Sequence, residues 1–153
     1  AHLIECVELR DGKIPNFHGE DVGVCTLEML KYYNSLDECP SIKADCEKVD
    51  WDDVYAFYGD MAPDVKKLNE PENCIDPVTP EILKENWSAI RKIIKSVPGY
   101  DEVKEAMEKA GCKITVSDIG KSEKLFSDCV KYSPYMRKRL TLLRLKDMIK
   151  PAE

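Results

Sequence analysis

The two histidines of this chain, His2 and His18, are the residues whose type and spacing are best suited to chemistry. Neutral imidazoles bind divalent metal ions, and a catalytic site made from two of them and one carboxylate leaves a coordination position open. A substrate oxygen bound at that position would be polarised by the ion. Isolated histidines, however, commonly form ordinary hydrogen bonds in the core or at the surface. Spacing alone leaves both interpretations open.

His18 stands where a loop is predicted to enter an amphipathic helix. Gly12 suits the left-handed turn after a helix and Pro15 prevents an easy restart, so the helix that contains His2 should end near them. A second helix is predicted from about residue 20 to 36, where two acidic residues in the first turn suit the helix dipole and apolar residues recur at helical spacing. We therefore expect the turn to bring the two imidazole rings together.

The rest of the chain also predicts helices, separated by irregular segments. Asp50 and Thr79 suit helix caps, and Pro98-Gly99 and Gly111 end helices. Further helices are expected at about 51–58, 63–68, 80–97, 100–110, 125–130 and 134–149, with loops at about 37–48 and 70–77 and a short extended piece at 113–116. Because 153 residues fall within the usual size of one domain, we expect an all-α fold, a single helical bundle over residues 1–153.

The charge balance of the chain bears on its partners. Lys and Arg number 23 against 29 Asp and Glu, and the net charge of −6 gives no broad attraction to nucleic-acid phosphates or to anionic membranes. No run approaches the roughly 20 apolar residues of a membrane span, and the N-terminus lacks the layout of a signal peptide. We expect a soluble, cytoplasmic protein without a nucleic-acid or membrane partner.

The seven cysteines favour free thiols. Their number is odd and no Cys-x-x-Cys pair occurs, so neither a zinc knuckle nor a disulfide framework is indicated. Reduced thiols packed as small hydrophobic side chains are the expected state. A disulfide between Cys39 and Cys46 is the alternative.

Residues 18–26, His-Gly-Glu-Asp-Val-Gly-Val-Cys-Thr, resemble a motif of the metal-dependent dehydrogenases related to dehydroquinate synthase, a family that includes glycerol-1-phosphate and glycerol dehydrogenases. The resemblance implies that this chain corresponds to the helical, metal-binding C-terminal domain of that fold. It implies His2 and His18 as catalytic metal ligands, with the third ligand a carboxylate from a helix before Ala1. The resemblance also implies a nucleotide-binding half on the N-terminal side. This chain has no strand followed by a glycine-rich turn and helix that could take that role.

A second match lies near the C-terminus, where residues 136–143 resemble the aliphatic-Arg-x-Arg-aromatic-Thr-x-Leu pattern of glycerol-1-phosphate dehydrogenases. Arg137 and Arg139 fit this pattern, whereas Leu140 replaces the aromatic residue and Arg144 stands where an acid is common. Arginine suits bidentate recognition of phosphate, so the resemblance implies a substrate-phosphate contact. The alternative is a solvated face of the last predicted helix.

One departure narrows the choice within the family. Cys6 lies four residues after His2, where related enzymes often carry a second histidine that dehydroquinate synthases use in their chemistry. Its absence disfavours the synthase and favours a dehydrogenase.

The resemblance implies a glycerol-1-phosphate dehydrogenase-like oxidoreductase of phospholipid metabolism. As a full-length enzyme it would reduce dihydroxyacetone phosphate, a small phosphorylated polyol precursor, using a divalent metal (zinc, iron or nickel) as Lewis acid and NAD or NADP bound mainly by the N-terminal domain. The 153-residue chain alone should be inactive. A homo-oligomer is compatible with the resemblance, and the sequence does not decide the oligomeric state. The alternatives are a glycerol or other alcohol dehydrogenase, a 3-dehydroquinate synthase, or a non-catalytic helical interaction module.

Overall fold

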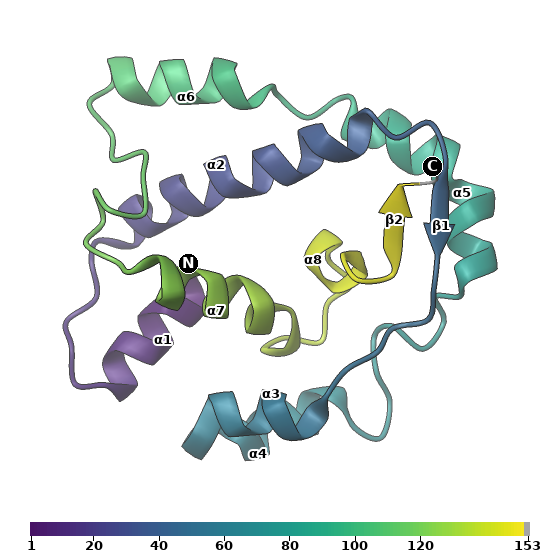
Figure 1. Cartoon of the computed structure of the whole chain (residues 1–153). Coiled ribbons are helices and arrows are strands. Elements are labelled where there is room, and N and C mark those ends of the chain that lie inside the picture. The colour runs from purple at the N-terminus through teal and green to yellow at the C-terminus, as the bar shows by residue number, and fades with distance from the viewer. Residues whose placement is uncertain (152–153) are drawn as a thin grey trace. The chain divides into compact units, whose positions relative to one another are not determined.

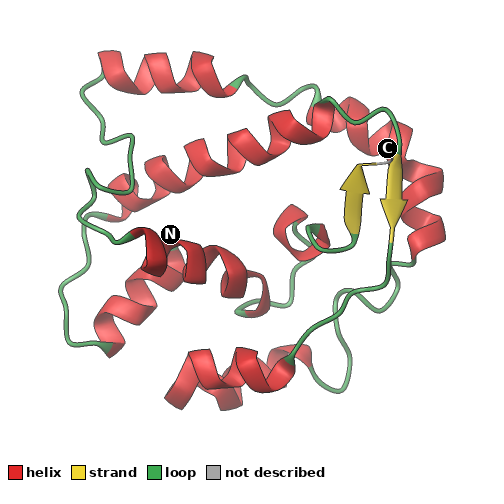
Figure 2. Ribbon diagram, viewed as in Figure 1, coloured by secondary structure: helices red, strands yellow, loops and turns green. Residues whose placement is uncertain are grey.

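Helices make up most of the protein, whose computed structural model describes residues 1–151 (Figure 1; Figure 2). The α-helices are α1 (His2–Arg10), α2 (His18–Asp37), α3 (Trp51–Tyr58), α4 (Ala62–Asn69), α5 (Pro80–Ile94), α6 (Tyr100–Lys109), α7 (Glu123–Tyr132) and α8 (Leu142–Leu145). Two short 3-10 helices, η1 (Gly59–Met61) and η2 (Ser133–Tyr135), and two strands, β1 (Ile42–Ala44) and β2 (Ile149–Pro151), complete the order. The predicted all-α class is confirmed.

The chain forms two compact units, and the first comprises residues 1–39 and 89–129. Within it, α6 packs against α2. A Cβ atom at Gly23 of α2 would lie 2.9 Å from Cε of Met107, so the absence of a side chain there permits this close packing. The core of the unit consists of buried apolar side chains: Leu3, Ile4, Val7, Val24, Leu27, Leu30, Leu36, Cys39, Ile94, Val116, Ile119, Phe126 and Cys129.

The second unit comprises residues 40–88 and 130–153, described here to residue 151. Asp50 caps α3 as expected, since its side chain accepts a hydrogen bond from the backbone N–H of Asp53 at 3.1 Å. The buried Tyr58 hydroxyl donates to the backbone oxygen of Tyr132 at 2.8 Å and so joins α3 to α7. The apolar core here is Ile42, Ala44, Val54, Tyr58, Val65, Ile75, Leu83, Trp87, Tyr132, Met148 and Ile149.

The single long helix predicted over residues 134–149 is wrong. The structure instead has η2, bends through residues 136–138, the four-residue α8, and the strand β2. Thr141 begins α8 as a cap, its hydroxyl accepting from the backbone N–H of Arg144 at 3.4 Å. Leu140, which was assigned to the apolar face of the predicted helix, is 52% exposed. Apolar spacing across this segment therefore arises from several short elements.

Two shorter segments also differ from expectation. The predicted loop at 37–48 contains β1, whose Lys43 and Ala44 pair antiparallel with Lys150 and Ile149 of β2. The predicted extended piece at 113–116 forms no strand and leads into a turn that begins at residue 116. The Asp118 carboxylate accepts from the backbone N–H groups of residues 114 and 115 at 3.1 and 2.9 Å.

All seven cysteines lie within the described part of the chain, and none is in a disulfide, as expected. Only Cys39 and Cys129 are buried, and Cys46 and Cys112 are exposed, so the expected packing of the thiols in the core holds for two of them. Among residues 1–151, no helix has both the length and the apolar character that crossing a membrane requires.

Candidate functional site

The two histidines come together in the first unit, each as the first residue of its helix. His2 begins α1 and His18 begins α2, and their ring centres lie 4.9 Å apart in an edge-to-face arrangement with an interplanar angle of 60°. The His18 side chain is 54% exposed, and His2 is also exposed. His2 and His18, which begin different helices, thus form one accessible pair of imidazole rings.

The connection between the two helices holds them in this arrangement. Gly12 has φ +72°, a backbone conformation that glycine adopts without strain, and it ends α1 where the sequence predicts. Asn16 then fixes the linker, because its Nδ2 donates to the backbone oxygen of Ile119 at 2.7 Å and to Oδ1 of Asp21 at 3.3 Å. The turn at Gly12 and the two hydrogen bonds of Asn16 therefore position His18 at the start of α2.

Glu5 also belongs to this site, although sequence reasoning did not select it. Its Oε1 accepts a hydrogen bond from Nδ1 of His18. Glu5 follows His2 by three residues on α1, so the two side chains share a face of the helix. The spacing His-x-x-Glu on a predicted helix was the available signal, but the sequence does not say which of the two histidines the carboxylate contacts.

A buried charge cluster lies in the same unit as the histidine pair. Lys121 Nζ lies 2.5 Å from Oε1 of Glu8, and both side chains are almost completely buried. Asp21 is fully buried, and its Oδ2 has no hydrogen-bond partner among the described residues. Burial raises the pKa of Asp21, while the positive charge of Lys121 opposes that rise. The cluster therefore contains two acidic groups, Glu8 and Asp21, and one basic group, Lys121.

Asp21→Asn is expected to change how stability depends on pH. Since the pKa of Asp21 is raised in the folded state, the folded protein binds more protons than the unfolded one between the ordinary value of about 3.9 and the raised value. The free energy of unfolding should fall as pH rises through that window, and the substitution should remove that fall. Urea unfolding across the acidic range measures it.

The control for this measurement is Asp64→Asn, whose exposed carboxylate pairs with Lys67 at 3.3 Å. The control should follow the pH profile of the unmodified protein. If the pH profile of Asp21→Asn matched those of the unmodified protein and of Asp64→Asn, protonation of the buried Asp21 carboxyl would not be linked to folding.

The donor set fits part of a metal site. Two nitrogens that share one ion at about 2.0–2.1 Å can be no more than roughly 4 Å apart, and ring centres 4.9 Å apart allow ring edges to meet this limit. No group of three or more His, Cys, Asp or Glu side chains with metal-binding geometry occurs among residues 1–151. The geometry of His2 and His18 is therefore compatible with two ligands of such a site.

Arg137 and Arg139 lie in the second unit, outside any helix. Both are exposed, and the backbone N–H of Arg139 donates to the backbone oxygen of Arg137 at 2.8 Å in a tight turn. Lys138 between them lies 3.8 Å from Glu72. The helical face that was the alternative interpretation of these arginines is absent, and their guanidinium groups are accessible from a turn.

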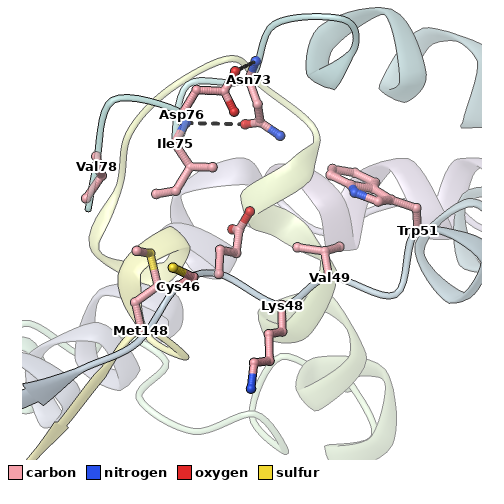
Figure 3. Close-up of a pocket in the computed structure, with 10 residues that line it drawn as sticks. Cys46, Lys48, Val49, Trp51, Asn73, Ile75, Asp76, Val78 and Met148 are labelled. Atoms are coloured by element: carbon pink, nitrogen blue, oxygen red, sulfur yellow. Dashed lines mark hydrogen bonds between the residues drawn. The ribbon is translucent and has the colours of Figure 1, made fainter. Parts of the chain in front are cut away.

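The second unit also contains a hollow of about 510 Å³, drawn in Figure 3. Its lining residues are Cys46, Glu47, Lys48, Val49, Trp51, Asn73, Ile75, Asp76, Val78 and Met148. Asn73 organises one wall, since its backbone N–H donates to Asp76 at 2.8 Å and its Oδ1 accepts from the N–H of Ile75 at 3.4 Å. Glu47 and Asn73 both also bind the buried Arg144. Sequence reasoning did not find this hollow, because its walls come from segments predicted as loops.

Comparison with known proteins gives a distant relative. The chain is 24% identical over 144 residues, 94% of its own length, to glycerol-1-phosphate dehydrogenase (NAD(P)+) of Geobacillus stearothermophilus. It spans 30% of the length of that protein. No family model matches the chain, and no solved structure matches it. The chain is thus similar to part of a nicotinamide-dependent dehydrogenase.

Proposed function

We propose that this chain is the metal-binding helical domain of a glycerol-1-phosphate dehydrogenase-like oxidoreductase. The observation that carries the proposal is the convergence of His2 and His18 at the starts of α1 and α2. The distant similarity to a dehydrogenase supports the same conclusion. Because the chain spans 30% of the length of that relative, the nucleotide-binding half belongs to the proposal as a separate domain of a longer protein.

In this proposal the imidazole nitrogens of His2 and His18 hold one divalent ion, zinc, iron or nickel, together with a carboxylate from elsewhere in the longer protein. Such an ion, when bound, supplies Lewis-acid polarisation of a substrate carbonyl. The exposed rings leave room for that substrate, dihydroxyacetone phosphate, beside the histidines. NAD or NADP, bound by the other domain, supplies the hydride.

Arg137 and Arg139 are proposed to bind the substrate phosphate. Their accessible guanidinium groups suit the charge and geometry of a phosphate. This assignment rests on the resemblance of residues 136–143 to the family pattern.

The test uses the longer protein that contains this chain, supplied with dihydroxyacetone phosphate and either NADH or NADPH. We expect oxidation of the cofactor that is lost after chelation and restored by zinc, iron or nickel. The 153-residue chain by itself should oxidise neither cofactor. Metal-restored activity on glycerol or on another alcohol instead would assign a related dehydrogenase, and no turnover with any of these substrates would favour an interaction module.

A further inference from the structure

Glu5 is an acidic side chain in direct contact with His18. It accepts from Nδ1 of His18, and its own side chain is only 21% exposed. An ionised carboxylate can only accept hydrogen bonds, so the contact requires a hydrogen on Nδ1. In the neutral ring the lone pair is then on Nε2.

This arrangement has a direct consequence for metal binding. Histidine ligands commonly donate their other ring N–H to a carboxylate, which fixes the tautomer and the ring orientation and makes the ligand nitrogen more basic. On this basis we propose that Glu5 is a positioning residue for His18, which holds Nε2 of that ring ready for the ion. The inference rests on the proposed function for the identity of the ion, but the hydrogen bond itself does not.

The position of Glu5 on α1 makes the contact specific. His2 and Glu5 project from one face of the same helix, so α1 supplies both the neighbouring ring and the carboxylate that orients His18. Lys121, another charged group of this unit, is instead paired with Glu8, with 2.5 Å between Nζ and Oε1.

Two substitutions separate positioning from direct ligation. Glu5→Ala removes the acceptor, whereas Glu5→Gln keeps a neutral acceptor oxygen for Nδ1–H but is a poor replacement for a carboxylate ligand. The matched control is Glu28→Ala on α2, which removes a partly exposed carboxylate paired with Lys31 at 2.5 Å. Circular dichroism and thermal unfolding verify that each variant folds.

The first measurement is the tautomer of His18 in the metal-free chain, read from the ring nitrogen shifts of protein labelled with ¹⁵N at histidine. Because the chain has only two histidines, the spectrum can be assigned by comparison with a His2→Ala variant. We expect the hydrogen on Nδ1 in the unmodified chain, in Glu5→Gln and in Glu28→Ala, and a shift toward the Nε2–H form in Glu5→Ala. An unmodified chain with the same tautomer mixture as Glu5→Ala would overturn the inference.

The second measurement is the Zn²⁺ affinity of the longer protein that contains this chain, by competition with a chromophoric chelator. Loss of a carboxylate that orients a ligand typically weakens metal affinity about 10–100-fold, and we expect this for Glu5→Ala but not for Glu5→Gln. Equal loss in both variants would make Glu5 a ligand and overturn the positioning role. Absence of zinc binding in every variant, with the Nδ1 tautomer intact, would instead contradict the proposed function and support the hydrogen bond as inferred.

Discussion

Arg144→Ala is expected to lower the free energy of unfolding by about 3–5 kcal/mol, the usual cost of removing one partner of a buried ion pair. The Arg144 side chain has no exposed surface, and its Nε lies 2.6 Å from Oε1 of Glu47. Burial raises the pKa of Glu47, and the guanidinium charge opposes that rise. Without Arg144 the Glu47 carboxylate would keep its burial and lose its counter-charge.

The guanidinium also satisfies other buried groups of the second unit. It donates to Oδ1 of Asn69 at 3.3 Å and to Oδ1 of Asn73 at 2.9 Å. Its central carbon lies 4.5 Å from the ring centre of Tyr135 and 5.7 Å from that of Trp51, within the range of cation–π attraction. The alanine variant would therefore lose ring contacts and leave two amide oxygens without this donor.

Urea unfolding of the variant measures the loss, with Lys150→Ala as the control. Lys150 lies 3.6 Å from Asp45 in the same unit, but both side chains are exposed, so its removal should cost no more than about 1 kcal/mol. The double substitution Glu47→Leu with Arg144→Met should recover much of the stability, because it removes both charges together. Equal losses for Arg144→Ala and Lys150→Ala would show that the buried network contributes nothing beyond a surface pair.

The role of Arg144 illustrates what the sequence could not predict. The sequence showed only that Arg144 falls within the predicted helix over 134–149 and stands where an acid is common in the family pattern. Its partners Glu47, Asn69 and Asn73 lie more than seventy residues earlier in the chain. No local pattern encodes such contacts. The sequence did not predict the strands β1 and β2 for the same reason. Each has only three residues, and the two lie near opposite ends of the second unit in the sequence.

The first unit was more predictable because its determinants are local. Gly12 and the acidic first turn of α2 define the helix ends on either side of His18, and the structure places both ends close to expectation. The convergence of the two rings followed from that short connection. The Glu5 contact did not, because helical spacing gives the face of α1 but not its rotation relative to α2.

His18→Ala in the longer protein is expected to abolish metal-dependent turnover and to leave the fold intact. Lewis-acid stabilisation by a bound ion is worth several kcal/mol, and about 1.4 kcal/mol corresponds to a tenfold rate change, so the rate should fall by about 10²-fold or more. The ring is 54% exposed and lies outside the core, so the free energy of unfolding should change by about 0.5 kcal/mol or less.

The control for this measurement is Lys13→Ala, a substitution of an exposed residue in the connection between α1 and α2. It should retain the rate of the unmodified protein and its response to chelation. The His18→Ala protein should instead bind zinc more weakly and show no recovery when metal is restored after chelation. Normal turnover by His18→Ala would remove the histidine pair from catalysis. In the unmodified protein the two rings would still be neighbours at the starts of α1 and α2. Their proximity would then be explained by the Glu5 contact and by edge-to-face packing alone.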